Sequence, residues 1–238
     1  MWMVATCLDL GLCIKQLFWN NQSRFTRFAR KNVANTLSVA NMITGLSSIF
    51  FSFNGKCQGA CWLLLLGFLL DLADGAVARQ LNTCSTLGAK MDDFADFTTF
   101  GIATALLLQV DGLLSGLLAI FYVLAVFLRL CFYSTGIPFT YRGLPCPYAG
   151  SFLASVSLLT SSNVVILRSL ALLMMLFMVD QSYYPHDKVL ESQRWKKVVF
   201  AGGVFMLIWS SLDTASFYFL TWATSYIIFP TALWGRLA

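Results

Sequence analysis

The sequence predicts an all-α fold, a bundle of helices that crosses a membrane several times. Composition is the first observation: of 238 residues, 58% are hydrophobic and only 11% are charged, whereas about 25% of the residues in a typical soluble domain are charged. The second is that apolar stretches recur along the chain at lengths near the roughly 20 residues that a helix needs to cross a bilayer. A soluble bundle of this size could not bury so many apolar stretches.

We expect about eight transmembrane helices in one polytopic bundle. Six or seven also fit the pattern, because the last four stretches are short and residues 147–179 could form one long bent helix. The chain divides accordingly into a cytosolic or interfacial segment, residues 1–32, and one membrane domain, residues 33–238. The expected spans are Val33–Phe53, Cys61–Gln80, Leu87–Leu108, Leu113–Tyr133, Pro147–Thr160, Val164–Val179, Val198–Ser211 and Thr214–Leu233.

The charges between these spans predict the orientation of the chain. Cations gather in the N-terminal segment and in or directly beside every second loop, whereas the alternate loops contain only Lys56. Positively charged loops stay in the cytosol, so we expect both termini there. Residues 18–31 are expected to form an amphipathic helix at the membrane surface, with phenylalanines on one face and cations on the other. A simple topogenic cluster of charges is the alternative for this segment.

Acidic residues gather at the ends of the second and third expected helices. Asp71, Asp74, Asp92, Asp93 and Asp96 are five of the 11 acidic residues in the chain. A charge at the centre of a membrane helix costs about 2.5–3.5 kcal/mol on insertion scales, and neighbouring carboxylates repel one another. A divalent cation would compensate for both effects, and oxygen ligands from two helices suit magnesium or manganese.

Helical periodicity places several of these residues on one face of the second helix. Asp71, Asp74, Gly75, Ala78 and Arg79 lie within an arc of roughly 140° at 3.6 residues per turn. The two small residues leave space for a ligand or another helix to approach. The arginine offers a planar cation that can bind a phosphate.

The third helix presents a matching stripe. Gly88, Asp92 and Asp96 follow one another at intervals of four residues, so their side chains share one face. The short segment 80–87 joins the two helices, and a hairpin of this kind lets the two carboxylate faces meet.

The two helices together contain the pattern DxxDGxxAR, eight intervening residues, and GxxxDxxxD. The segment from Asp71 to Asp96 matches every fixed position and resembles the active-site motif of the CDP-alcohol phosphotransferases; a salt-bridged structural cluster is the alternative. A wider resemblance, over roughly residues 33–190, is to the phosphatidylserine synthase branch of that family. It rests on the segment Asn35–Asn41 with Gly45, on Leu81–Thr83, on Ala95–Gly101, on Arg129 and on the turn Gly143–Pro147.

Three positions depart from that branch. Asp93 adds an acidic residue where the branch commonly has a small polar one, and Tyr141 and Arg142 precede the turn in place of an aromatic and a neutral residue. These departures weaken the assignment of the acceptor more than the assignment of the chemistry.

The resemblance implies transfer of a phosphatidyl group from CDP-diacylglycerol to an alcohol, with release of CMP. It implies that Asp71, Asp74 and Asp92 bind two Mg²⁺ or Mn²⁺ ions, and that Asp96 removes the proton of the acceptor hydroxyl and also touches metal. The residues expected to contact the substrate are Gly75, Ala78, Arg79, Gly88 and Arg129.

Several alternatives stay open on the sequence alone. Serine is the acceptor that the branch suggests, but inositol and glycerol phosphate are acceptors of proteins with the same motif. A divalent-cation transporter and a catalytically silent lipid-binding relative are the other functional classes, and the clustering of the acids toward one face speaks against the transporter. The expected partners are CDP-diacylglycerol, a small alcohol and membrane lipid, without nucleic acid, and a homodimer is left open. The compartment would be the endoplasmic reticulum in a eukaryote and the plasma membrane in a bacterium.

Overall fold

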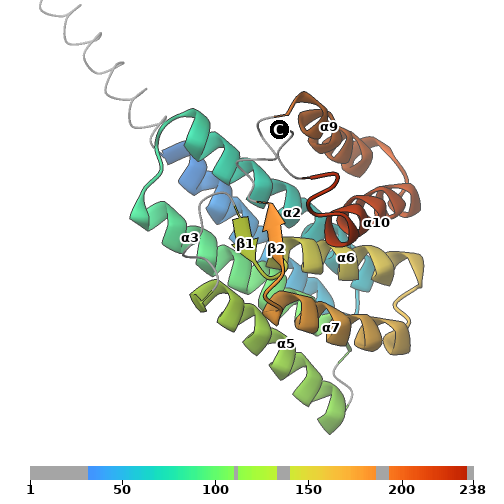
Figure 1. Ribbon diagram of the computed structural model, residues 1–238. Coiled ribbons are helices and arrows are strands. Elements are labelled where there is room, and N and C mark those ends of the chain that lie inside the picture. Colours follow the sequence, from blue (N-terminus) through green and yellow to red (C-terminus); the bar gives the residue numbers. More distant parts are fainter. Residues whose placement is uncertain (1–31, 110–111, 133–139, 186–192, 235–238) are drawn as a thin grey trace, which may run out of the picture.

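The computed structural model describes residues 32–109, 112–132, 140–185 and 193–234 (Figure 1). Within these residues the chain forms eight helical rods and one short β-ribbon. The rods are helix 32–53 (Asn32–Phe53), α2 (Cys57–Gln80), α3 (Thr86–Asp96) continued by the π-helix η1 (Phe97–Ala103) and α4 (Thr104–Leu106), α5 (Leu113–Phe132), α6 (Cys146–Leu159), α7 (Val164–Val179), α9 (Arg194–Trp209) and α10 (Leu212–Ile228). The strands are β1 (Thr140–Arg142) and β2 (Tyr183–Pro185).

Each of the eight expected spans coincides with one rod, which confirms the all-α class. Residues 147–179 do not form one bent helix, because α6 and α7 are separated by a turn in which Ser161 and Ser162 have positive φ. The ribbon was not expected from the sequence. The interfacial helix expected at 18–31 lies outside the described residues.

The number of membrane crossings expected from the sequence needs correction. Among the described residues, three helices, namely 32–53, α2 and α5, are long and apolar enough to cross a membrane, which is fewer than eight. Helices α6, α7, α9 and α10 have only 14 to 17 residues, or about 21–26 Å of helix, and the hydrocarbon core is about 30 Å thick. The third expected span begins with charged residues and is divided by the π-helix.

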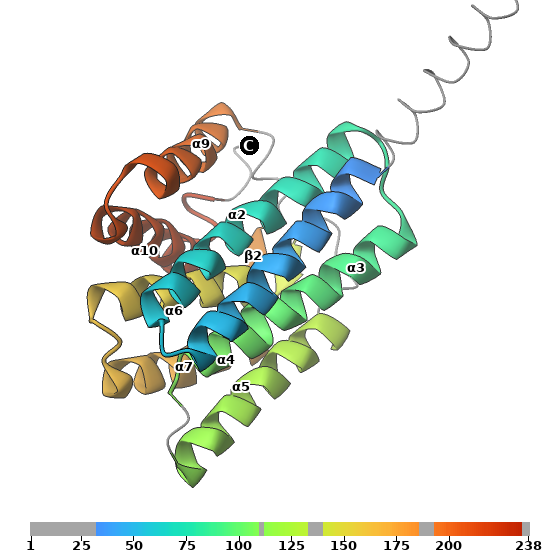
Figure 2. The same ribbon diagram turned by 180° about the vertical axis from the view of Figure 1, so that it is seen from behind.

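Four rods form the part of the bundle that contains the acidic residues. Figure 2 shows helix 32–53 lying between α2 and α3, with α5 on the far side of α3. Helix 32–53 approaches η1 closely at Gly45, where a Cβ atom would lie only 2.9 Å from the Cα of Thr99. The hydroxyl of Thr99 donates a hydrogen bond of 3.1 Å to the carbonyl of Asn41. A small residue at position 45 therefore permits this contact.

An aromatic core joins α2 to α6 and α10. Phe68 of α2 packs edge-on against Tyr148 of α6 and Trp222 of α10, with ring centroids 5.2 Å apart in both pairs. Tyr148 stacks in parallel on Tyr226 at 3.7 Å. These large buried rings pack α2 against α6 and α10.

The β-ribbon fixes the turn that precedes α6. The strands are antiparallel, with Tyr141 opposite Tyr184. Tyr184 is buried, and burial raises the pKa of its phenol. Gly143 has a φ of +67°, and a Cβ there would lie 2.3 Å from the carbonyl oxygen of Met178, so the turn requires glycine. Its N–H donates to the carbonyl of Ser182 at 2.9 Å. The turn is thereby anchored to the end of α7, and it places Cys146 at the start of α6.

Candidate functional site

Three of the expected carboxylates meet between α2 and α3. One oxygen from each of Asp71, Asp74 and Asp92 can be chosen so that all lie within 4.8 Å of one another. Asp71 and Asp74 are one helical turn apart on α2. Ser85 caps α3 by accepting a hydrogen bond from the N–H of Gly88 at 3.0 Å, and the helix that starts there turns Asp92 toward α2. The hairpin expected from the spacing is therefore present.

Asp74 is the most deeply buried of these three carboxylates. It is 4% exposed, and the hydroxyl of Ser38, on helix 32–53, donates a hydrogen bond of 2.6 Å to its Oδ2. A hydrogen bond to one oxygen holds the carboxylate in a single orientation and leaves its other oxygen to accept a different ligand.

Asp96 connects the cluster to α5 and α6. Its carboxyl group is close enough to that of Asp71 for direct interaction. The thiol of Cys146 donates to Oδ2 of Asp96 at 3.6 Å, and the guanidinium of Arg129 donates to that sulfur at 3.1 Å. Arg129 and Asp96 are 6% and 7% exposed. A buried chain of donors thus runs from Arg129 through Cys146 to Asp96.

One oxygen of Asp96 is left without a hydrogen bond. Its Oδ1 is buried and has no partner among the described residues. A buried carboxylate oxygen normally accepts a hydrogen bond or binds a cation. A bound cation, or a proton shared with the neighbouring carboxyl group of Asp71, would satisfy this oxygen.

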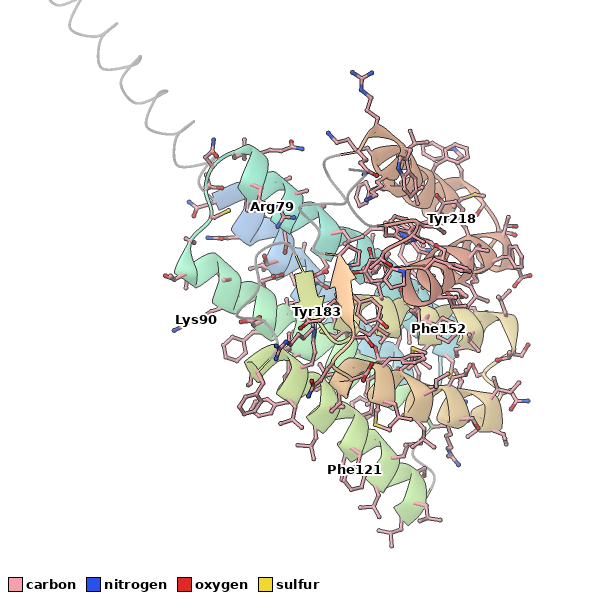
Figure 3. The ribbon with its side chains drawn as sticks, viewed as in Figure 1. Arg79, Lys90, Phe121, Phe152, Tyr183 and Tyr218 are labelled. Atoms are coloured by element: carbon pink, nitrogen blue, oxygen red, sulfur yellow. The ribbon has the colours of Figure 1, made fainter. Side chains whose placement is uncertain are left out.

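The other expected site residues surround the carboxylates. A Cβ atom at Gly75 would lie 2.9 Å from a guanidinium nitrogen of Arg79, so the arginine folds back over the glycine. Ala78 is half-buried on the same face of α2. A Cβ at Gly88 would lie 3.0 Å from Oδ1 of Asn35, which brings helix 32–53 against the start of α3. Figure 3 shows Arg79 near the carboxyl end of α2.

Asp93 lies apart from the cluster. It is exposed, whereas Asp92 is half-buried, as the helical phase of α3 predicts. Figure 3 shows that Lys90, on the same helix, also points away from the bundle. The five acidic residues of the sequence cluster thus separate into four that face one another and one that does not.

The sequence predicted no role for Ser38 or Cys146, although both lie in segments on which the family resemblance rests. A signal for Ser38 was available, because Asn35, Ser38 and Asn41 follow one another every three residues of one helix, which gives a polar stripe. Cys146 had no comparable signal. Its contact with Asp96 spans 50 positions of the chain and depends on the turn before α6.

The donor set fits a hard divalent cation. Four carboxylates, contributed by α2 and α3, lie together with little exposure, and such a group is stable only when positive charge compensates for it. Oxygen-only ligands are those that Mg²⁺, Mn²⁺ and Ca²⁺ prefer. The unpartnered Oδ1 of Asp96 is consistent with this reading.

The chain matches the model of one protein family, that of the CDP-alcohol phosphatidyltransferases, over residues 31–160. It is 60% identical to Transmembrane protein 269 of Homo sapiens over 197 residues, which cover 83% of this chain and 97% of that protein. It is 32% identical to a CDP-diacylglycerol–serine O-phosphatidyltransferase of Bacillus subtilis over 172 residues, 67% of this chain and 96% of that enzyme. The corresponding enzyme of Saccharomyces cerevisiae is 29% identical over 153 residues, 56% of this chain and 55% of that enzyme.

The family match includes α2, α3 and every residue of the carboxylate cluster, and its members are membrane proteins. The matched family and several relatives are phosphatidyltransferases by name. The chain is therefore a transferase. It belongs to the CDP-alcohol phosphatidyltransferase family.

Proposed function

We propose that the protein transfers a phosphatidyl group from CDP-diacylglycerol to a small alcohol, with serine as the first candidate acceptor, and releases CMP. The observation on which this rests is the convergence of Asp71, Asp74 and Asp92 within 4.8 Å, on a hairpin that has the full motif of a transferase family. Serine is the first candidate because several relatives are serine O-phosphatidyltransferases by name.

In the proposed reaction the hydroxyl oxygen of the acceptor attacks the phosphorus that bears the diacylglycerol. The bond from this phosphorus to the bridging oxygen breaks, and CMP leaves with that oxygen. The proton of the hydroxyl passes to Asp96. When bound to Asp71, Asp74 and Asp92, two Mg²⁺ or Mn²⁺ ions would neutralise the charge of the pyrophosphate. Arg79 would bind a phosphate beside Gly75, where the lack of a side chain leaves room for both.

Cys146 and Arg129 have a positioning role in this proposal. The thiol donates to Oδ2 of Asp96, so Oδ1 is the oxygen directed toward the acceptor. Arg129 donates to the sulfur and places a positive charge beside the carboxylate. Asp96 is thus held in one orientation, which is a requirement for a general base.

The same proposal includes the orientation of the protein. We infer that both termini and the carboxylate cluster are on the cytosolic side. In the expected topology most cations between the helices lie on the same side of the membrane as the termini, and Lys56 lies on the opposite side. Positively charged loops stay in the cytosol. A cytosolic site is reached by the nucleotide from water and by the acyl chains from the bilayer.

The test is an assay of CMP release by the purified protein. CDP-diacylglycerol is offered with Mn²⁺ or Mg²⁺ and, in separate reactions, serine, inositol or glycerol 3-phosphate. We expect CMP to appear with serine, to be lost in excess chelator and to return when the metal is restored. Full activity in excess chelator would exclude the metal role. Absence of CMP with every alcohol would favour a lipid-binding relative without turnover, and metal flux through liposomes would instead indicate a transporter.

A further inference from the structure

A cavity lies against the face of α2 that is turned away from the carboxylates. It has a volume of about 300 Å³ and lies between α2, α9 and α10. In Figure 1, α9 and α10 are at the upper right and α2 runs from the upper left to the centre. Ala76 and Gln80 of α2 form one wall, Phe200 of α9 another, and Trp222 and Trp234 a third. The size is in the range of cavities that hold small ligands, and the walls are mostly apolar.

The cavity and the carboxylate cluster use opposite faces of the same helix. At 3.6 residues per turn, Gln80 is about 180° around the helix axis from Asp71, and Ala76 is about 200° from Asp74. The body of α2 therefore separates the cavity from the proposed catalytic site. A headgroup bound at the carboxylates would not reach the basic residues of the cavity.

The charged residues among the described lining of the cavity are both basic. Lys196 and Lys197 line it, and none of its described lining residues is acidic. Lys196 is 4% exposed and donates a hydrogen bond of 2.7 Å to the carbonyl of Trp234, whereas Lys197 is exposed. A cavity with apolar walls and two lysines attracts a molecule that has both an apolar chain and a negative charge.

We propose that this cavity binds an anionic phospholipid, distinct from CDP-diacylglycerol, with one acyl chain against α2 and its phosphate at Lys196 and Lys197. Basic pockets between membrane helices on the cytoplasmic side bind anionic headgroups in this way. Tryptophan side chains such as Trp222 and Trp234 are frequent at the headgroup level of a bilayer. The two lysines disfavour phosphatidylcholine, because its choline group adds a positive charge and leaves the headgroup without a net negative charge.

The experiment measures quenching of tryptophan fluorescence by brominated lipids in vesicles that contain the full chain. Brominated phosphatidic acid and brominated phosphatidylcholine are titrated separately into a zwitterionic background. The chain has seven tryptophans, so the signal from the cavity is the difference between the unaltered protein and a Trp222→Phe/Trp234→Phe variant. We expect this difference signal to saturate at a low fraction of the phosphatidic acid and to be weak with phosphatidylcholine.

Two variants test the residues of the cavity. Lys197→Gln should lower the apparent affinity for phosphatidic acid about fivefold, the effect of one lysine near an anionic lipid surface. Ala76→Phe should remove the saturable signal by filling the cavity. Lys56→Gln, a cation at the other end of α2, is the matched control and should have no effect. Equal quenching by the two lipids, or unchanged quenching in both cavity variants, would overturn the proposal.

A further variant separates this site from the substrate site. Asp71→Asn/Asp74→Asn should leave the preference for phosphatidic acid intact. Loss of the preference in that variant would show that the lipid enters the carboxylate site and would refute a second site. Because the readout is binding, a protein that releases no CMP would refute the proposed function alone and leave this inference standing.

Discussion

Asp92 and Asp93 are neighbours in the chain but have different surroundings. Asp92 is half-buried and faces Asp71 and Asp74, whereas Asp93 is exposed on the outer side of α3. This difference could be predicted from the sequence, because it follows from the helical period alone. The link from Asp96 to Cys146 and Arg129 could not, since it joins three helices that are distant along the chain.

Replacement of each of the two neighbours by asparagine tests this assignment. Asp92→Asn should abolish CMP release, because the cluster loses one of its three converging carboxylates. Asp93→Asn should retain most of the activity, and both variants should keep the thermal unfolding profile of the unaltered protein. An equal loss of CMP release in the two variants would show that the orientation of α3 is wrong.

The role of Asp96 can be separated from that of the metal-binding residues. Asp96→Asn should slow the chemical step by about 10²–10⁴-fold, the usual contribution of a general base, with nearly normal binding of CDP-diacylglycerol. Asp71→Asn should lose binding of CDP-diacylglycerol as well, because the metal ion that Asp71 is proposed to bind also holds the pyrophosphate of that substrate. The measurements are calorimetric binding of the CDP-lipid and single-turnover release of CMP at saturating acceptor. If both variants lose binding equally, Asp96 is chiefly a metal ligand.

At the scale of elements, apolar length alone located all eight rods. The start of α3 also had a local signal, the capping serine at position 85. The π-helix had none, and its contacts with helix 32–53 around Thr99 join segments that are far apart in the sequence. π-Helical turns are often found at functional sites, and η1 follows directly after Asp96. The β-ribbon likewise pairs segments that the sequence pattern does not connect.

The contact at Gly45 gives a test of this packing. Gly45→Val should lower the free energy of unfolding by about 1–3 kcal/mol, the typical cost of overpacking. The new Cβ would lie 2.9 Å from the Cα of Thr99, and backbone cannot move aside as a side chain can. CMP release should fall as well, because η1 continues directly from Asp96. Leu46→Val, at the adjacent exposed position, is the control. A thermal melt of Gly45→Val that matches this control would exclude the close approach.

At the scale of the whole molecule, the described helices enclose the carboxylate cluster and have apolar side chains on much of their outer surface. Phe50, Phe121 and Leu176 are 66%, 59% and 68% exposed, which fits contact with lipid better than contact with water. The sequence could predict this amphipathic arrangement from composition. It could not predict how the shorter rods α6, α7, α9 and α10 are arranged, because their packing joins segments that are distant along the chain, such as α6 with α10 and α5 with α7.

The two ends of α2 provide reporters for the orientation of the protein. This helix has 24 residues and is roughly 36 Å long, so Cys57 at its start and Cys84 just beyond its end should lie on opposite sides of a bilayer. In sealed microsomes with the cytosolic face outward, a membrane-impermeant maleimide should modify Cys84, which is exposed. Cys131, which is exposed near the end of α5, should react with the maleimide under the same conditions. Cys57 should react only after detergent opens the vesicles, and mass spectrometry of the peptides resolves the three sites. Modification of Cys57 before detergent, with Cys84 protected, would establish the reverse orientation and place the carboxylates on the lumenal side.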